Sequence, residues 1–153
     1  MTSLGDNPTY ATFSRLVRVQ TALWHEVDAR LRRQHDVALS EVTALQVVAE
    51  TPQCRVQDIV TTLHITVGGA SKVVDRLVGA GHVVRLPHPS DRRSSLLDVT
   101  ASGLELLERA APDVQAVLRR RLDSVLTTRD MGELNRILRS LQGPAIHSEG
   151  AAS

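Results

Sequence analysis

Apolar residues recur every three or four positions near both ends of the chain, which is typical of amphipathic helices. One long helix is predicted from residue 9 to about residue 33, with the apolar stripe Phe13, Leu16, Leu23, Val27 and Leu31. Two helices are predicted after residue 100, with the stripes Leu104, Leu107, Ala111, Val114, Leu118, Leu122 and Val125, and then Leu134, Ile137, Leu138 and Leu141. Pro112 predicts a kink or a break in the first of these, because proline lacks an N–H.

Three shorter helices are predicted between the long ones. Ser40 is the expected N-cap of one that Thr51-Pro52 ends, and a second covers residues 56–63. Thr66 is the expected N-cap of a third, from residue 67 to about residue 80, and Gly81 suits its C-terminal stop. The inward face of that third helix is predicted to be Ala70, Val73, Val74 and Leu77.

The apolar period then changes to two, which indicates β-strands. Residues 82–88 and 94–100 are predicted to pair as a hairpin around a charged tip. Thr100 is the expected N-cap of the long helix that follows, and Thr127 with Asp130 resembles a capping box before the last one. The predicted fold is mostly α with a small β-hairpin wing, a winged helix-turn-helix flanked by long helices.

The expected organisation is one structural domain with loose ends. Its predicted parts are a flexible N-terminus (1–8), a dimerisation helix (9–35), a winged helix-turn-helix (36–100), dimerisation helices (101–142) and a flexible tail (143–153). The dimerisation role given to the long helices depends on the resemblance named below.

Composition excludes several classes of protein. Apolar residues make up 42% of the 153 residues and charged residues 23%, as in ordinary globular proteins. The chain has one Tyr, one Phe and one Trp, which argues against an aromatic platform for single-stranded nucleic acid. A single cysteine, Cys54, excludes an intrachain disulfide and a cysteine-rich zinc site. With no signal peptide or apolar span in the sequence, the expectation is a soluble cytoplasmic protein without a membrane partner.

No catalytic or cofactor-binding motif is present in the sequence, so an enzyme is not expected and no cofactor is predicted. His25, Glu26 and Asp28 are close in sequence, but they lack the spacing of a metal site, and none is predicted. Cys54 is expected to be a small, partly buried residue rather than a redox sensor, since only Arg55 nearby could lower its pKa.

The distribution of charge points to double-stranded DNA. The whole chain carries +1, whereas residues 66–93 hold five basic residues against two acidic ones. Lys72 and Arg76 share one face of the predicted third short helix, opposite its apolar face, and a helix of this kind suits a major groove. Arg92 and Arg93, at the hairpin tip, could enter a minor groove.

Several motifs resemble the MarR family of bacterial transcription regulators. They are Leu39-Ser40 with Leu45, Leu63-His64-Ile65-Thr66, Ser71-Lys72, Val74-Asp75-Arg76-Leu77, Gly81, Pro89-Ser90-Asp91-Arg92-Arg93 and Thr100-Ala101-Ser102-Gly103. The resemblance implies a homodimer, with its first and last two helices interlocked between subunits. It also implies a pseudo-palindromic operator, Arg93 in the minor groove and Asp91 bracing that arginine. The candidate DNA-binding residues are Thr66, Gly68, Ser71, Lys72, Arg76, Asp91, Arg92 and Arg93.

The resemblance further implies a repressor that a small molecule, anionic or phenolic in many relatives, releases from DNA. Trp24 is a weak candidate for the effector site, although a lone Trp on such a helix is more often interface core. His64 replaces a turn glycine, and Gly68-Gly69 replaces polar residues that could read bases. The alternative function is a helical dimer that sequesters a small molecule or a protein partner without specific DNA binding.

Overall fold

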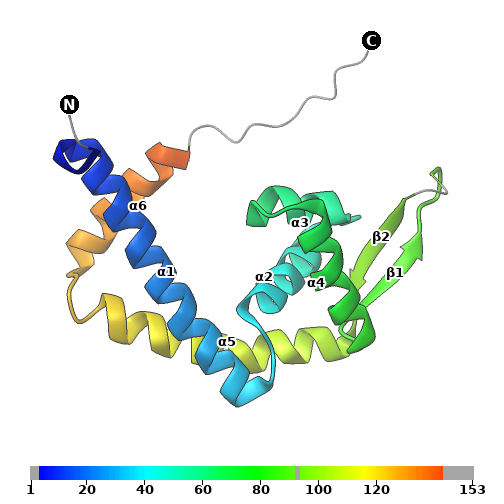
Figure 1. Ribbon diagram of the computed structural model, residues 1–153. Helices are drawn as coiled ribbons and strands as arrows, with labels where there is room; N and C mark the ends of the chain where they lie inside the picture. The colour runs from blue at the N-terminus through cyan, green and yellow to red at the C-terminus, as the bar shows by residue number, and fades with distance from the viewer. Residues whose placement is uncertain (1–3, 92–93, 143–153) are drawn as a thin grey trace, which may run out of the picture. The chain divides into compact units, whose positions relative to one another are not determined.

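The computed structural model of the protein describes residues 4–91 and 94–142 (Figure 1). A short 3₁₀ turn (Leu4–Asp6) precedes six α-helices and one hairpin. These are α1 (Pro8–His35), α2 (Leu39–Glu50), α3 (Val56–Leu63), α4 (Val67–Gly79), β1 (Val83–Pro87), β2 (Ser95–Val99), α5 (Ala101–Leu122) and α6 (Thr128–Gln142). The predicted fold class is confirmed. The described residues fall into two compact units, divided between Leu118 and Arg119.

The core of the first unit is built around α2, α3 and α4. The inward face predicted for α4, Ala70, Val73, Val74 and Leu77, is buried. Leu45 of α2 and Ile59 of α3 are fully buried in the same cluster. Burying a Val, Leu or Ile side chain of this cluster stabilises the fold by about 1.5–3 kcal/mol. The helix-turn-helix is therefore held by the packing of these apolar faces.

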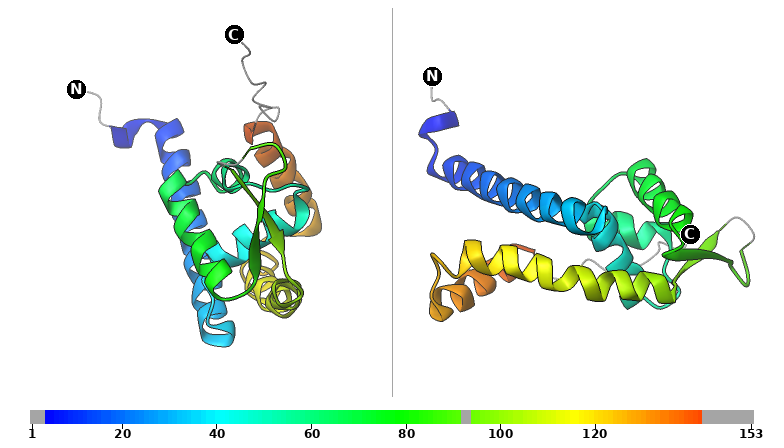
Figure 2. Two further views of the ribbon diagram at one scale, coloured as in Figure 1. Left: turned by 90° about the vertical axis from the view of Figure 1, so that its right-hand side faces the viewer. Right: turned by 90° about the horizontal axis from the view of Figure 1, so that it is seen from below.

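The hairpin is a two-stranded antiparallel sheet that extends away from these helices (Figure 2). Val83 pairs with Val99 and Pro87 pairs with Ser95. Val83 and Leu97 are buried in the core, and the Leu97 N–H donates to the Cys54 carbonyl at 2.8 Å. The base of the wing is thus anchored to the segment between α2 and α3.

The predicted start of α2 is wrong by two residues. Its N-cap is Ala38, in extended backbone, and not Ser40. Alanine has no side-chain acceptor, but the Glu41 carboxylate accepts from the Ala38 N–H at 2.8 Å. The polar contact at the start of α2 therefore comes from an acid three residues into the helix, and not from a serine cap.

Helix α5 narrows one prediction and corrects another. Of the kink or break predicted at Pro112, the break is ruled out, because α5 runs unbroken through this residue. Glu108, whose carbonyl loses its helical partner at Pro112, is exposed, and water can satisfy that group. The predicted stripe is displaced, because the buried residues are Gly103, Leu106, Ala110 and Val117. Apolar residues lie on two adjacent faces of this helix, and the sequence pattern did not distinguish between them.

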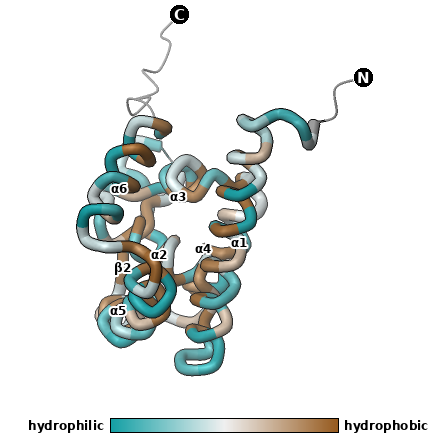
Figure 3. Tube along the Cα trace, turned by 90° about the vertical axis from the view of Figure 1, so that its left-hand side faces the viewer, coloured by the Kyte–Doolittle hydropathy of each residue, from teal (hydrophilic) through white to brown (hydrophobic). Residues whose placement is uncertain are grey.

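Apolar side chains remain exposed on α1 and α6. In α1, Val27 and Leu31 are buried as predicted, whereas Phe13 is 58% exposed. In α6, Ile137, Leu138 and Leu141 of the predicted stripe are exposed, Leu141 to 68%, whereas Leu134 is half-buried. Figure 3 shows hydrophobic residues recurring along each of these helices. Among the described residues, no helix combines the length and the apolar character needed to cross a membrane.

Candidate nucleic-acid interface

The N-terminus of α4 is built as predicted. The Thr66 hydroxyl oxygen accepts a hydrogen bond from the Gly69 N–H at 3.0 Å. His64, in the turn before it, has a φ of 51°, the left-handed conformation that glycine adopts most easily. Histidine is strained there to a modest degree, and the chain still turns from α3 into α4. Thr66 is exposed, so its side chain both caps α4 and lies at the surface.

The two glycines in the first turn of α4 have different surroundings. A Cβ added at Gly68 would meet no atom within 4 Å, whereas one at Gly69 would lie 3.1 Å from the Thr66 Oγ1. Packing within the chain therefore does not require a glycine at 68. The exposed backbone there is open to close approach by another molecule.

The outward face of α4 is basic. Lys72 and Arg76 are exposed opposite the buried face, and Ser71 is half-buried beside them. Lys72 makes no ion pair with any residue that the structure describes. These three candidates lie on one helix with Thr66 and Gly68, as the sequence predicted.

Arg76 carries a contact that the sequence did not reveal. Its Nε donates to Oε1 of Glu41 at 2.8 Å, and the Arg76 side chain remains 55% exposed. Glu41 lies on α2, 35 positions away in sequence. No periodicity or motif connects the two residues, so only the packing of α2 against α4 could identify the pair.

A second acid holds the arginine of β1. Arg85 donates from Nη2 to Oδ1 of Asp75 at 2.7 Å and from Nη1 to the Ser95 hydroxyl at 3.4 Å. This ion pair connects the wing to α4. Both charges are visible in the sequence, but nothing in it predicts that they pair.

The wing tip is described only in part. Asp91 is exposed, and Arg92 and Arg93, the candidates for a minor groove, lie outside the described residues. Directly after β1, where the tip begins, the Nε2 of His88 contacts Arg55. Arg55 follows α2, so this contact supports the outer part of the wing from a second segment.

The Thr100–Gly103 motif anchors α5 to the end of α4. Thr100 donates from its hydroxyl to the Gly81 carbonyl at 2.7 Å and from its N–H to the His82 carbonyl at 3.1 Å. Its hydroxyl also accepts from the Gly103 N–H at 3.1 Å, which caps α5 as predicted. A Cβ at Gly103 would lie 2.3 Å from the His82 carbonyl oxygen. The motif therefore holds the start of α5 against the segment between α4 and β1.

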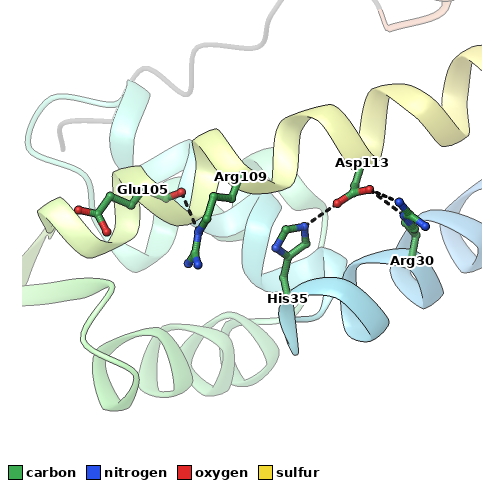
Figure 4. A network of polar contacts seen from close by, with 5 residues as sticks. All are labelled: Arg30, His35, Glu105, Arg109 and Asp113. Carbon is green, nitrogen blue, oxygen red and sulfur yellow. Dashed lines mark hydrogen bonds and ion pairs between the residues drawn. The ribbon is translucent and has the colours of Figure 1, made fainter.

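Away from this face, Asp113 of α5 binds two residues of α1 (Figure 4). Its carboxylate contacts Arg30 at 2.6 Å and the Nε2 of His35 at 2.7 Å. The hydrogen bonds from His35, and then from Arg30, hold the pKa of the Asp113 carboxyl below its ordinary value of 3.8. The network links the end of α1 to the middle of α5.

The structure also places Cys54 and Trp24, which the sequence singled out. Cys54 is fully buried, and burial raises the pKa of its thiol to about 11, so the reactive thiolate is scarce at neutral pH. Trp24 is 37% exposed on α1. Within the described residues, no three acidic, histidine or cysteine side chains are grouped to hold a metal ion.

An open groove of about 580 Å³ lies between α2 and α5. Its lining is mostly apolar, with Leu39, Val42, Leu107 and Val114 among its residues. Glu50 and Glu108 are the charged residues in that lining. The sequence does not predict this groove, because its two walls are more than fifty residues apart along the chain.

Comparison with known proteins identifies relatives of this arrangement. A family model described as MarR family matches residues 35–94, from the end of α1 to the wing tip. The multiple antibiotic resistance protein MarR of Escherichia coli (strain K12) is 32% identical over 79 residues, which cover 52% of this chain and 55% of that protein. The chain thus spans about half the length of the curated relatives it matches.

Similarity to solved structures extends over more of the chain. Sco3205, a MarR family transcriptional regulator from Streptomyces coelicolor solved in complex with DNA, has a TM-score of 0.79 at 25% identity. The match covers 95% of this chain and 92% of that one. The Mycobacterium tuberculosis MarR family protein Rv2887, in complex with p-aminosalicylic acid, has a TM-score of 0.69 at 28% identity, covering 84% and 96%.

Proposed function

The chain resembles the MarR family in sequence and fold, and from that premise we propose that it is a sequence-specific regulator of transcription. It binds double-stranded DNA as a homodimer on a pseudo-palindromic operator and acts as a repressor. Its place of action is the cytoplasm, where such an operator is accessible. The single observation that carries the proposal is the capped helix α4, buried on one face and basic on the other, beside an anchored wing.

In the proposed complex, α4 enters the major groove. Lys72 and Arg76 bind phosphates or base edges of the DNA. Thr66, Gly68 and Ser71, at the start of α4, approach the DNA backbone. Arg92 and Arg93 reach the minor groove from the wing, with Asp91 bracing Arg93. Lys72 is well suited to a phosphate contact, since it has no ion pair among the described residues to give up.

The exposed apolar residues of α1 and α6 support the homodimer. A monomer that left Phe13 and Leu141 more than half exposed would offer apolar surface that a second copy can bury. In a dimer, two α4 helices meet half-sites about one helical turn apart on the same side of the duplex.

The experiment that tests the proposal starts from a random duplex pool. The full chain selects bound duplexes over several rounds, and fluorescence anisotropy compares the enriched duplex with a scrambled one. Regulators of this kind prefer their site by at least about 10³-fold. Arg93→Ala should weaken binding while leaving the dimer intact, and Lys72→Ala should lower the slope of log Kd against log salt by about 0.9. Equal, weak binding to both duplexes would favour the sequestering alternative.

We also propose that a small phenolic molecule releases the protein from DNA by binding the groove between α2 and α5. Support comes from the mostly apolar lining of the groove and from the Rv2887 complex with p-aminosalicylic acid, a phenol that also carries a carboxylic acid group. Because Glu50 and Glu108 line it and no basic residue does, the groove suits an uncharged phenol better than an anion. An effector that prefers a conformation with differently spaced α4 helices would shift the population away from DNA.

Paired ligands test the effector proposal. Methyl salicylate should release the selected duplex at lower concentration than salicylate, which carries the same ring with a negative charge. Ala111→Trp fills the groove and should abolish the response while DNA binding persists. A response that is unchanged in this variant would place the effector elsewhere.

A further inference from the structure

Glu41 occupies an unusual position between two helices. It is the third residue of α2, and its side chain is only 15% exposed. Oε2 accepts from the Ala38 N–H at 2.8 Å, and Oε1 accepts from the Arg76 Nε at 2.8 Å. One carboxylate therefore satisfies the first turn of α2 and binds the outward arginine of α4.

Glu41 holds Arg76 in a way that leaves the terminal nitrogens of the guanidinium available. The contact uses Nε, the nitrogen nearest the aliphatic stem. Among the described residues, Nη1 and Nη2 of Arg76 have no hydrogen-bond partner. These two nitrogens form the planar fork that recognises phosphate oxygens or a guanine edge. Arg85 is held differently, because Asp75 occupies its Nη2.

We infer that Glu41 is a positioning residue for DNA binding, which orients the guanidinium of Arg76 toward the duplex. The inference rests on the proposed function. An unbraced arginine loses rotamer freedom when it binds a phosphate, and an arginine that is already held loses less. Glu41 is itself fixed by the N-terminus of α2, whose dipole favours a carboxylate, so it forms a rigid support.

If net charge alone decided DNA affinity, removing the charge of Glu41 would strengthen binding, which is the opposite of what a positioning role predicts. Glu41 carries a negative charge near a surface that would meet phosphates, so Glu41→Gln raises the local charge by one. If only net charge mattered, that variant would bind DNA more tightly. If orientation of Arg76 matters more, the variant binds more weakly, because a neutral amide is a poorer acceptor for the guanidinium than a carboxylate. The sign of the change therefore separates the two effects.

The chain offers a matched control for the capping role of Glu41. Asp58 is the third residue of α3, and its Oδ2 accepts from the Arg55 N–H at 2.7 Å. Among the described residues, no hydrogen bond or ion pair joins Asp58 to α4. Asp58→Asn thus weakens an equivalent cap without touching Arg76.

The experiment uses the whole chain and the duplex that it selects from a random pool. Anisotropy gives Kd over a salt series for Glu41→Gln, Arg76→Ala, the double variant and Asp58→Asn, all below their unfolding temperatures. Glu41→Gln should weaken binding about 5-fold and lower the salt slope, and the double variant should bind like Arg76→Ala alone. Asp58→Asn should match the wild type in Kd and slope.

Three results would overturn the inference while leaving the proposed function intact. They are binding by Glu41→Gln as tight as the wild type or tighter, additive effects of the two substitutions, and an equal loss in Asp58→Asn. A wild-type chain that enriches no duplex would overturn the inference and the proposed function together.

Discussion

Replacing Gly103 by alanine tests whether the junction between α4 and α5 requires the absence of a side chain at position 103. The added Cβ would lie 2.3 Å from the His82 carbonyl oxygen and 2.9 Å from Cγ2 of Val99. The nearer atom belongs to the backbone, and it already accepts the Thr100 N–H at 3.1 Å. The His82 carbonyl therefore cannot move aside without disturbing the connection between α4 and α5.

The expected loss of stability follows from three effects. Overpacking of this kind costs about 1–3 kcal/mol, and a backbone contact this close places Gly103→Ala near the upper end of that range. Weakening the Thr100 hydrogen bond adds about 1 kcal/mol. Alanine recovers at most about 1 kcal/mol of helix propensity. The net destabilisation is about 3 kcal/mol, which corresponds to a fall in Tm of roughly 6–12 °C.

Gly68→Ala provides the matched control. It also replaces a glycine in the first turn of a helix, but its Cβ would meet nothing within 4 Å. We expect it to stabilise the protein by up to about 1 kcal/mol. Urea and thermal unfolding at one fixed protein concentration compare the two variants with the wild type. If Gly103→Ala proved as stable as Gly68→Ala, the assignment of Gly103 to close packing would be wrong.

Three further predictions concern single contacts. Because the pKa of Asp113 is lowered in the folded protein, its stabilisation is complete above the ordinary value of 3.8 and is lost as the pH falls through the lowered pKa. Asp113→Asn should therefore reduce stability at neutral pH and flatten the acid limb of a stability profile measured by urea unfolding; an unchanged limb would refute the role of the His35 and Arg30 contacts. Cys54, with a pKa of about 11 and no exposed surface, should react with iodoacetamide at pH 7.5 far more slowly in the native protein than in urea, and rapid native labelling would contradict its burial. Thr66→Ala removes the cap of α4 and should lower the free energy of unfolding by about 1 kcal/mol, whereas Thr66→Ser should retain it.

Local patterns were sufficient to predict most elements of the winged helix. The apolar spacing of α4 gave the correct buried face, and Thr66 was correctly predicted as its cap. The change from a period of about 3.6 to a period of two located the hairpin within one or two residues at each end. Each of these signals depends on residues a few positions apart, which is the range over which backbone propensity and capping act.

Helix boundaries and faces were predicted less well where neighbours outside the segment decided them. Ser40 is a better cap than Ala38 by residue type, but Glu41 satisfies the Ala38 N–H and moves the start of α2. In α5, the contacts with the rest of the first unit favour Leu106 and Val117 over the stripe chosen from the sequence. Pro112 did not break α5, because the exposed turn at this point can lose one hydrogen bond to water.

By itself, the sequence determined the order of the elements, the basic face of α4 and the resemblance to the MarR family. These depend on composition and on spacing along one chain. Only the tertiary structure decided the contacts between segments that are far apart, namely Glu41 with Arg76, Asp75 with Arg85 and Asp113 with Arg30 and His35. Ion pairs of this kind require two side chains to meet in space, and the packing of the buried apolar faces, rather than the charges, brings them together.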